Sequence, residues 1–92
     1  MYTVRSTQAY RKAYKRVLKQ KNFSRQTLEE VIHTLARGDK LAPTYLDHQL
    51  SGEFKNYREC HLQHDMLLMY QKHENVLVLL LVDLGTHDDL FG

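Results

Sequence analysis

The side chains best suited to acid–base chemistry gather in one stretch of the chain, Asp47–Asp65. It holds three of the six histidines and four of the eleven acidic residues. Imidazole groups can donate or accept protons near neutral pH, and a neighbouring carboxylate can hold an imidazole in one tautomer. We predict an acid–base site made by His48, His61 and Asp65, joined by His87 from the C-terminal segment.

His61 is predicted to point away from the core. Side chains alternate between the two faces of a strand, so Glu59 and His61 share one face and Cys60 takes the other. Cys60 belongs on the core side, because a free cysteine behaves as a small apolar residue. A hairpin turn over Gln63–Asp65 then brings the carboxylate at its end close to His61.

Metal binding is not expected from the spacing of the histidines. His61-x-x-His64 resembles ligand spacing, but on a strand these two side chains lie on opposite faces. The chain has one cysteine and no His-x-x-x-His sequence, so the zinc templates fail. His33, His64 and His73 are interpreted as surface residues, and no metal or other cofactor is predicted.

Several imidazoles and a carboxylate without a metal suit cleavage of RNA by the substrate's own 2′-hydroxyl. A base removes the 2′-hydroxyl proton, an acid protonates the leaving 5′-oxygen, and each transfer contributes roughly 10²- to 10⁴-fold. Lys55 and Arg58 are the only cations in the stretch, so they are the candidates for phosphate contact. Phe91 could stack on an unpaired base, or it could be an apolar plug that holds the C-terminus.

Charge is divided unevenly along the chain. Residues 1–40 carry ten of the thirteen Lys and Arg but only three acids, whereas residues 41–92 carry eight acids. One face of the first predicted helix is basic, which indicates an anionic partner such as RNA or an acidic protein segment. A solvated helix face is the alternative. The residues assigned to this contact are Arg11, Lys12, Lys15, Arg16 and Lys19.

The apolar pattern predicts a single α+β domain over residues 1–92. A short strand at Tyr2–Arg5 precedes two helices, the first capped by Ser6 or Thr7 and the second running from Ser24 to Gly38. Four strands follow, at Leu46–Leu50, Tyr57–Leu62, Met66–Gln71 and Val76–Val82. The order β-α-α-β-β-β-β favours a mainly antiparallel sheet packed against an N-terminal helical hairpin. The last strand is apolar throughout, as expected of a central strand covered on both faces.

Composition favours a cytoplasmic protein. A lone Cys60 forms no internal disulfide and fits a reducing compartment. The first seventeen residues are charged throughout, unlike a secretory signal. The longest aliphatic run, Val76–Val82, is too short to span a bilayer.

Three blocks of residues carry a family resemblance. They are Asp47-His48-x-Leu50-x-Gly52, then Tyr57-Arg58-x-x-His61-x-x-x-Asp65 with a strand ending in Tyr70, and the closing Gly85-Thr86-His87-x-x-Leu90-Phe91-Gly92. In this order and spacing they resemble the YafQ branch of the RelE superfamily, the toxins of type II toxin–antitoxin systems. The resemblance is strong over residues 41–92, and the basic helices before it are compatible with the family but not specific to it.

The resemblance implies a RelE-like fold and a ribosome-dependent mRNA endonuclease, a cytoplasmic protein held inactive by a cognate antitoxin. Its partners would be that antitoxin, the ribosome with its rRNA, and mRNA, with DNA reached only through the antitoxin and no membrane partner. The implied catalytic residues are His48, His61, Asp65 and His87, with Phe91 in support.

The chain departs from the family pattern at Met66 and Phe54, where tryptophan is expected, so codon preference is not carried over. Two alternatives to the nuclease stay open. One is a non-catalytic RNA-binding domain that uses the basic helical face. The other is an antitoxin-binding module that has lost cleavage.

Overall fold

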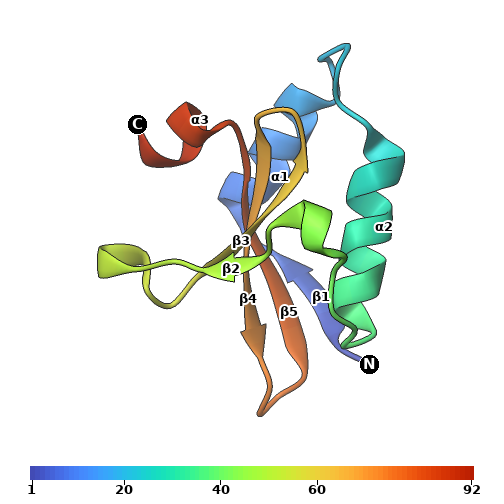
Figure 1. Ribbon diagram of the computed structural model, residues 1–92, viewed down its shortest axis with the longest axis vertical. Coiled ribbons are helices and arrows are strands. Elements are labelled where there is room, and N and C mark those ends of the chain that lie inside the picture. The colour runs from blue at the N-terminus through green and yellow to red at the C-terminus, as the bar shows by residue number, and fades with distance from the viewer.

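Five strands and three helices make up the structure, a computed structural model that describes residues 1–92 (Figure 1). In chain order they are β1 (Thr3–Ser6), α1 (Gln8–Val17), α2 (Arg25–Ala36), β2 (His48–Gln49), β3 (Arg58–Gln63), β4 (Met66–His73), β5 (Val78–Gly85) and α3 (His87–Phe91). The sheet has the order β1-β5-β4-β3-β2, with β1 parallel to β5 and every other pair antiparallel. The predicted α+β fold, a helical pair packed on a mainly antiparallel sheet, is confirmed.

The apolar stripes of α1 and α2 form the core with one face of the sheet. Thr7 and Ser24 cap the two helices, each accepting a hydrogen bond from a backbone N–H in the first turn. Burying one large aliphatic side chain contributes about 1.5–3 kcal/mol. The side chains that are at most 1% exposed include Val17, Leu28, Val31, Leu35, Cys60, Leu68, Leu79 and Leu84. This core makes the sheet a firm base for side chains on its other face.

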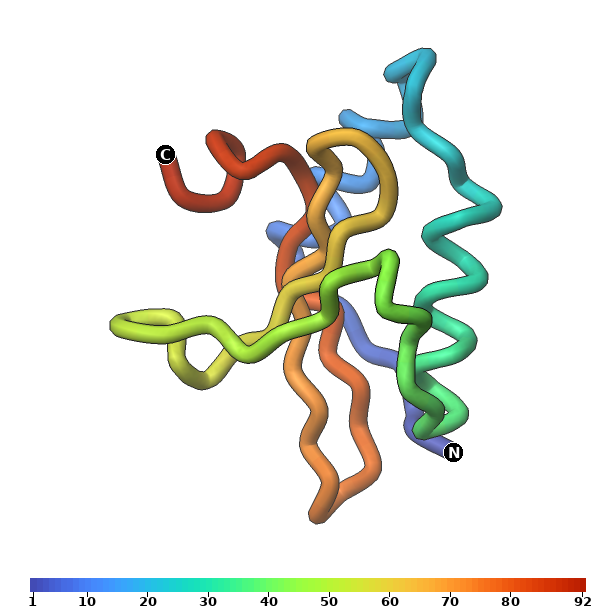
Figure 2. The backbone as a smooth tube through the Cα atoms, in the orientation of Figure 1, coloured from blue at the N-terminus to red at the C-terminus, as the bar shows by residue number.

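The two faces of the sheet carry different elements. Figure 1 shows α2 on one side of the sheet and α3, with the C-terminus, on the other. The segment between β2 and β3 projects away from the sheet on the same side as the C-terminus (Figure 2). A surface between this segment and α3 is therefore where distant parts of the chain can meet.

The predicted strands differ from the observed ones by one or two residues at most ends, and two of them differ more. The strand predicted at Val76–Val82 is β5, which starts later and ends later, at Val78–Gly85. Val76 and Leu77 lie in the preceding turn, 68% and 50% exposed, and Leu77 adopts a φ of 53°. Because both side chains are aliphatic and the turn contains no glycine, the sequence pattern did not indicate a turn here. The strand predicted at Leu46–Leu50 shortens to the two residues of β2, between two 3₁₀ turns at Pro43–Tyr45 and Gly52–Phe54.

The C-terminal segment, for which the sequence pattern predicted no element, forms α3. Thr86 and Asp89 make a capping box, in which each residue's backbone N–H donates to the other's side chain. The helix follows β5 directly and packs near its end. No helix in the structure has the length and apolar character needed to cross a membrane.

Candidate active site

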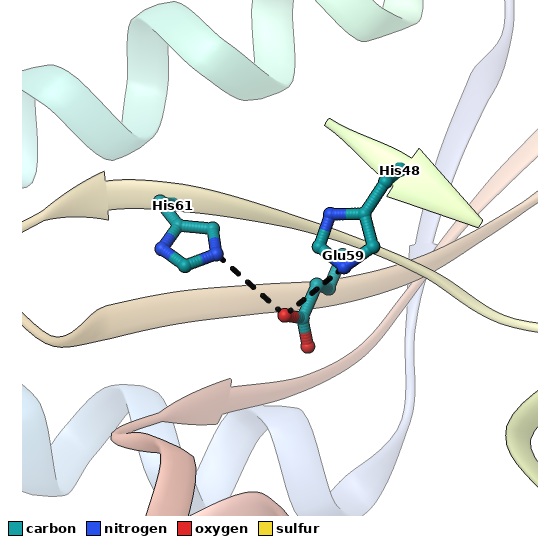
Figure 3. Close-up of side chains that lie close together, drawn as sticks. All are labelled: His48, Glu59 and His61. Atoms are coloured by element: carbon teal, nitrogen blue, oxygen red, sulfur yellow. Dashed lines mark ion pairs between the residues drawn. The ribbon is translucent and has the colours of Figure 1, made fainter. Parts of the chain in front are cut away.

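Glu59 of β3 lies at the centre of a cluster with two histidines (Figure 3). Its Oε1 atom is 3.5 Å from Nε2 of His48 and 3.7 Å from Nε2 of His61. The Glu59 side chain is only 7% exposed, whereas the His48 and His61 side chains are 48% and 36% exposed. Strand geometry explains the cluster, because Glu59 and His61 alternate onto one face and His48 pairs directly with Glu59 across β2 and β3.

The backbone fixes one ring nitrogen of His48. Nδ1 lies 2.6 Å from the carbonyl oxygen of Leu46. Because a carbonyl oxygen only accepts hydrogen bonds, Nδ1 is the protonated nitrogen in this contact. Leu46 has a φ of 49°, a left-handed conformation that leucine adopts only when its surroundings require it. Nε2 is therefore the nitrogen that His48 offers to Glu59 and to a substrate.

Asp47 anchors the residue before His48 to the sheet. It accepts hydrogen bonds from the Tyr70 hydroxyl and from Nε of Arg58, the latter at 3.3 Å. Tyr70 is fully buried. Burial, together with the hydrogen bond to Asp47, raises the pKa of Tyr70 well above its usual range, so the phenol remains a donor. β2 is thus tied to β3 and β4 by side chains as well as by its two backbone pairs.

His87 and Phe91 of α3 face the cluster across a hollow of about 340 Å³. The ring of Phe91 lies 4.9 Å from the ring of His87 and meets Phe54 edge-on at 5.1 Å, both measured between ring centroids. The hollow is lined by His48, Leu50, Ser51, Phe54, Glu59, His87 and Phe91. Aromatic rings beside titratable groups provide a surface for stacking an unpaired base next to proton donors and acceptors.

Of the four predicted catalytic residues, His48 and His87 line the hollow and His61 lies beside it in contact with Glu59, whereas Asp65 does neither. Asp65 is exposed in the hairpin turn before β4, and no hydrogen bond or ion pair joins it to His61. A register shift between His61 and Gln63 interrupts the pairing of β3 with β4 at this point. The expected contact is therefore wrong, and Glu59 supplies the carboxylate. Strand alternation had already placed Glu59 on the face of His61, which was the signal for its role.

The predicted phosphate contacts lie apart from the cluster. Arg58 bonds to Asp47, Tyr70 and Gln49, and as the neighbour of Glu59 in β3 it points to the opposite face of the strand. Lys55 is exposed next to the 3₁₀ turn Gly52–Phe54 and makes no ion pair. Neither cation lines the hollow.

The basic face of α1 is largely open to solvent. Lys12, Lys15 and Lys19 are exposed and make no ion pair. Arg11 donates a hydrogen bond of 2.7 Å to the carbonyl oxygen of Ser6. Arg16 differs from the others, because its guanidinium reaches α3, the helix that carries His87.

The cluster also has the arrangement of a metal-ligand group, which the spacing argument did not detect. One ligand atom each from His48, Glu59 and His61 lie within 4.8 Å of one another. Oε2 of Glu59 is buried and has no hydrogen-bond partner, a need that a cation would satisfy. Imidazole nitrogen and carboxylate oxygen suit Zn²⁺, Cu²⁺ and Ni²⁺. Glu59 and His61 alternate onto one face of β3, but His48 joins them only through the pairing of β2 with β3, so its sequence spacing from the other two is uninformative.

The fold is similar to that of solved YafQ toxin structures. The model of the family described as "Bacterial toxin of type II toxin-antitoxin system, YafQ" matches residues 2–92. The chain therefore belongs to the YafQ family of type II toxins.

Relatives of known identity agree with this family. The mRNA interferase toxin YafQ of Escherichia coli is 38% identical over 52 residues, which are 56% of this chain and 54% of that protein, so the match spans about half of the relative. A metal-bound toxin from Helicobacter pylori is similar in structure, with a TM-score of 0.91 and 41% identity over 99% of this chain and all of that one. YafQ in the E. coli DinJ–YafQ complex has a TM-score of 0.88 and 26% identity over the whole of both chains.

Proposed function

We propose that this toxin is a ribosome-dependent mRNA endonuclease that cleaves RNA through attack by the substrate's 2′-hydroxyl. The observation that carries the proposal is the cluster of His48, Glu59 and His61 at a hollow that His87 lines from a separate segment. His61 does not line the hollow itself but lies beside it, 3.7 Å from Glu59. Proton-transfer groups on either side of one hollow are what this reaction needs. The E. coli relative is called an mRNA interferase, which is the same class of enzyme.

In this mechanism one histidine takes the proton of the 2′-hydroxyl while another donates a proton to the leaving 5′-oxygen. The 2′-oxygen bonds to phosphorus as the bond to the 5′-oxygen breaks, leaving a 2′,3′-cyclic phosphate and a 5′-hydroxyl. We assign the two transfers to His87 and His61, with His48 in support. The carboxylate of Glu59 lies beside both imidazoles on the sheet side, where it would orient them for proton transfer. Asp65 has no step in this mechanism.

The ribosome is proposed to position the substrate. No lysine or arginine lines the hollow, so the toxin itself has little to hold a phosphate backbone there. Holding a substrate in reactive geometry can contribute several kcal/mol to a rate. The exposed cations of the α1 face, among them Lys12, Lys15 and Lys19, would contact rRNA, and the toxin would act in the cytoplasm.

A cognate antitoxin is the proposed regulatory partner. YafQ of E. coli has been crystallised with DinJ, and by analogy an antitoxin would hold this chain inactive and bring it indirectly to DNA. An acidic antitoxin segment would complement the basic face of α1 and compete with rRNA for it. Co-expression with a cognate antitoxin should relieve the growth arrest that the toxin is expected to cause.

The test is cleavage of an mRNA in a translation reaction assembled from purified ribosomes. We expect cut transcripts that end in a 2′,3′-cyclic phosphate, and no cut where a 2′-deoxynucleotide replaces the nucleotide at the cleavage position. The triple replacement of His48, His61 and His87 by alanine should abolish cutting while salt-sensitive RNA binding persists. Undiminished toxicity of the triple variant would contradict the proposal and favour a non-catalytic RNA-binding domain.

A second property is proposed for the same cluster, the binding of Cu²⁺, Ni²⁺ or Zn²⁺ by His48, Glu59 and His61. Its support is the proximity of the three ligand atoms and the unpaired Oε2 of Glu59, together with the H. pylori relative that is metal-bound. A bound ion would add positive charge at the edge of the hollow. Ligation would also occupy the imidazole lone pairs that proton transfer requires, so we expect these ions to inhibit cleavage.

Calorimetric titration tests this property without relying on activity. We expect binding to the wild-type protein, loss of most of it in Glu59→Gln, and no change in His73→Ala, which replaces an exposed histidine at the end of β4. Equal binding by wild-type protein and Glu59→Gln would contradict the assignment of Glu59 as a ligand.

A further inference from the structure

The helix that carries His87 and Phe91 is held by few contacts. α3 has five residues, none of them buried. A helix this short has little stability of its own, so its position depends on what binds it to the rest of the molecule. Phe91 packs edge-on against Phe54, and the polar contacts converge on Asp89.

Asp89 joins three parts of the structure. Its Oδ2 accepts a hydrogen bond of 2.9 Å from the backbone N–H of Thr86 and lies 3.6 Å from Nη2 of Arg16. The same Nη2 lies 3.4 Å from the carbonyl oxygen of Leu84 at the end of β5. One guanidinium on α1 therefore contacts both β5 and α3. The hydrogen bonds from Thr86 and, to a smaller extent, the charge of Arg16 lower the pKa of Asp89, so the carboxylate is ionised at neutral pH.

Gly85 makes room for this arrangement. A Cβ atom at position 85 would lie 2.8 Å from both Cβ and Oδ2 of Asp89, and 3.2 Å from Nη2 of Arg16. Carbon atoms in contact are normally about 3.5–4.0 Å apart. α3 therefore docks against a surface that only glycine leaves open, and a side chain there would displace it.

We propose that Arg16 and Asp89 are positioning residues that fix His87 and Phe91 at the hollow. The proposal rests on the proposed nuclease function, since it gives His87 a catalytic position to be held in. It assigns Arg16 a role different from that of Lys12, Lys15 and Lys19, whose charges face solvent. The helix expected to bind rRNA or an antitoxin is then the same helix that holds the catalytic segment in place.

Single substitutions distinguish the positioning role of Arg16 from the rRNA or antitoxin contact proposed for the basic face of α1. Asp89→Asn keeps an oxygen that can cap α3 but removes the charge that pairs with Arg16. Arg16→Gln removes the guanidinium, and Lys15→Gln is the matched control, since it removes the same charge from the adjacent exposed position. We expect kcat for cleavage on ribosomes to fall roughly tenfold in Asp89→Asn and Arg16→Gln with KM nearly unchanged, because a small misplacement lowers the rate of the chemical step. Lys15→Gln should raise KM alone.

A second measurement does not depend on cleavage. The NMR signals of the His87 imidazole and the Phe91 ring should shift in Asp89→Asn, Arg16→Gln and Gly85→Ala, because the two rings lie 4.9 Å apart and sense each other's position. The imidazole signals of His48 and His61 should not shift. If wild-type protein cleaves no RNA, the proposed function fails, but these signals still report whether the pair holds α3.

The proposal is overturned by any of three results. One is unchanged His87 and Phe91 signals in Asp89→Asn and Arg16→Gln. Another is shifted signals with wild-type kcat. The third is an equal loss of kcat in Lys15→Gln, which would make Arg16 one more member of the basic surface.

Discussion

The two sides of the proposed active site are built differently. On the sheet side, the Glu59 side chain is 7% exposed and lies on a strand whose other face contributes to the core. On the helix side, His87 and Phe91 belong to α3, a five-residue helix in which no residue is buried. They are held by an ion pair whose side chains, Arg16 and Asp89, are 53% and 40% exposed.

This difference has a functional consequence. The sheet side is preorganised, because moving it would disturb the core, whereas the helix side can move while the fold stays intact. Exposed ion pairs contribute only about 0–1 kcal/mol to stability. Substitutions that loosen the packing or anchoring of the sheet side should therefore change stability and activity together, whereas those on α3 should change activity alone.

The largest effect is expected from His87→Ala on the helix side. Removal of a proton-transfer group should lower the cleavage rate by roughly 10²- to 10⁴-fold. The melting temperature should not change, because His87 is exposed. Cleavage rates on ribosomes and thermal unfolding measure the two quantities, with His73→Ala as the control. A fall in melting temperature equal to that of a core variant would show that α3 is part of the folded core.

On the sheet side, Glu59→Gln should lower cleavage by roughly 10- to 100-fold. The amide keeps the shape of the side chain but removes the negative charge that lies beside His48 and His61. Stability should be unchanged or higher, because a neutral amide costs less to bury than a carboxylate with an unpaired oxygen. Urea unfolding measures this. Wild-type cleavage with stability reduced by several kcal/mol would make Glu59 a structural residue.

Tyr70→Phe tests whether the hydrogen bond between Tyr70 and Asp47, which anchors the residue before β2, supports both stability and cleavage. It removes the hydroxyl that donates to Asp47 and should lower the free energy of unfolding by about 1–3 kcal/mol, because a partly buried carboxylate loses a partner. Cleavage should fall severalfold as His48 loses its fixed position. Tyr45→Phe is the control, since the Tyr45 hydroxyl makes no hydrogen bond to the protein. Reduced stability with unchanged cleavage would separate the anchor from the site.

The smallest effect is the acid dependence of the α3 contact. The pKa of Asp89 is lower in the folded protein than in a free side chain. The stabilisation it gives is therefore complete above its unfolded pKa, near pH 4, and is lost as the pH falls through the folded value. NMR signals of Leu90 and Phe91 should change below about pH 4 before those of Leu68 in the core. Identical pH dependence in Asp89→Asn would rule out Asp89 as the cause.

Much of the fold could be predicted because its signals are local. The stripe Leu28, Val31 and Leu35 marks α2 and is buried as expected. Cys60 was assigned to the core side of β3 and is fully buried. The left-handed backbone conformation of Leu77 could not be predicted from the sequence. The turn imposes this conformation, and an aliphatic residue type gives no signal for it.

The site was predicted less completely because it depends on contacts between segments. His48 joins Glu59 only through the register of β2 on β3, and the displacement of Asp65 follows from an irregularity in the next pair of strands. A charged residue in the middle of a strand is usually expected to face solvent, so its sequence position alone did not predict Glu59 as a site residue. α3 had a signal in Thr86-x-x-Asp89, a capping-box pattern with Asp in place of Glu or Gln, but five residues are too few for an apolar stripe.

The central claim is that these two differently built sides form one catalytic unit, and a double-mutant cycle tests it most directly. Single-turnover cleavage on ribosomes is measured for wild type, His87→Ala, Glu59→Gln and the double variant. Residues that act as a unit are strongly non-additive, so we predict that the double variant is about as slow as His87→Ala alone. Losses that multiply would show that the two sides act independently and would contradict the account.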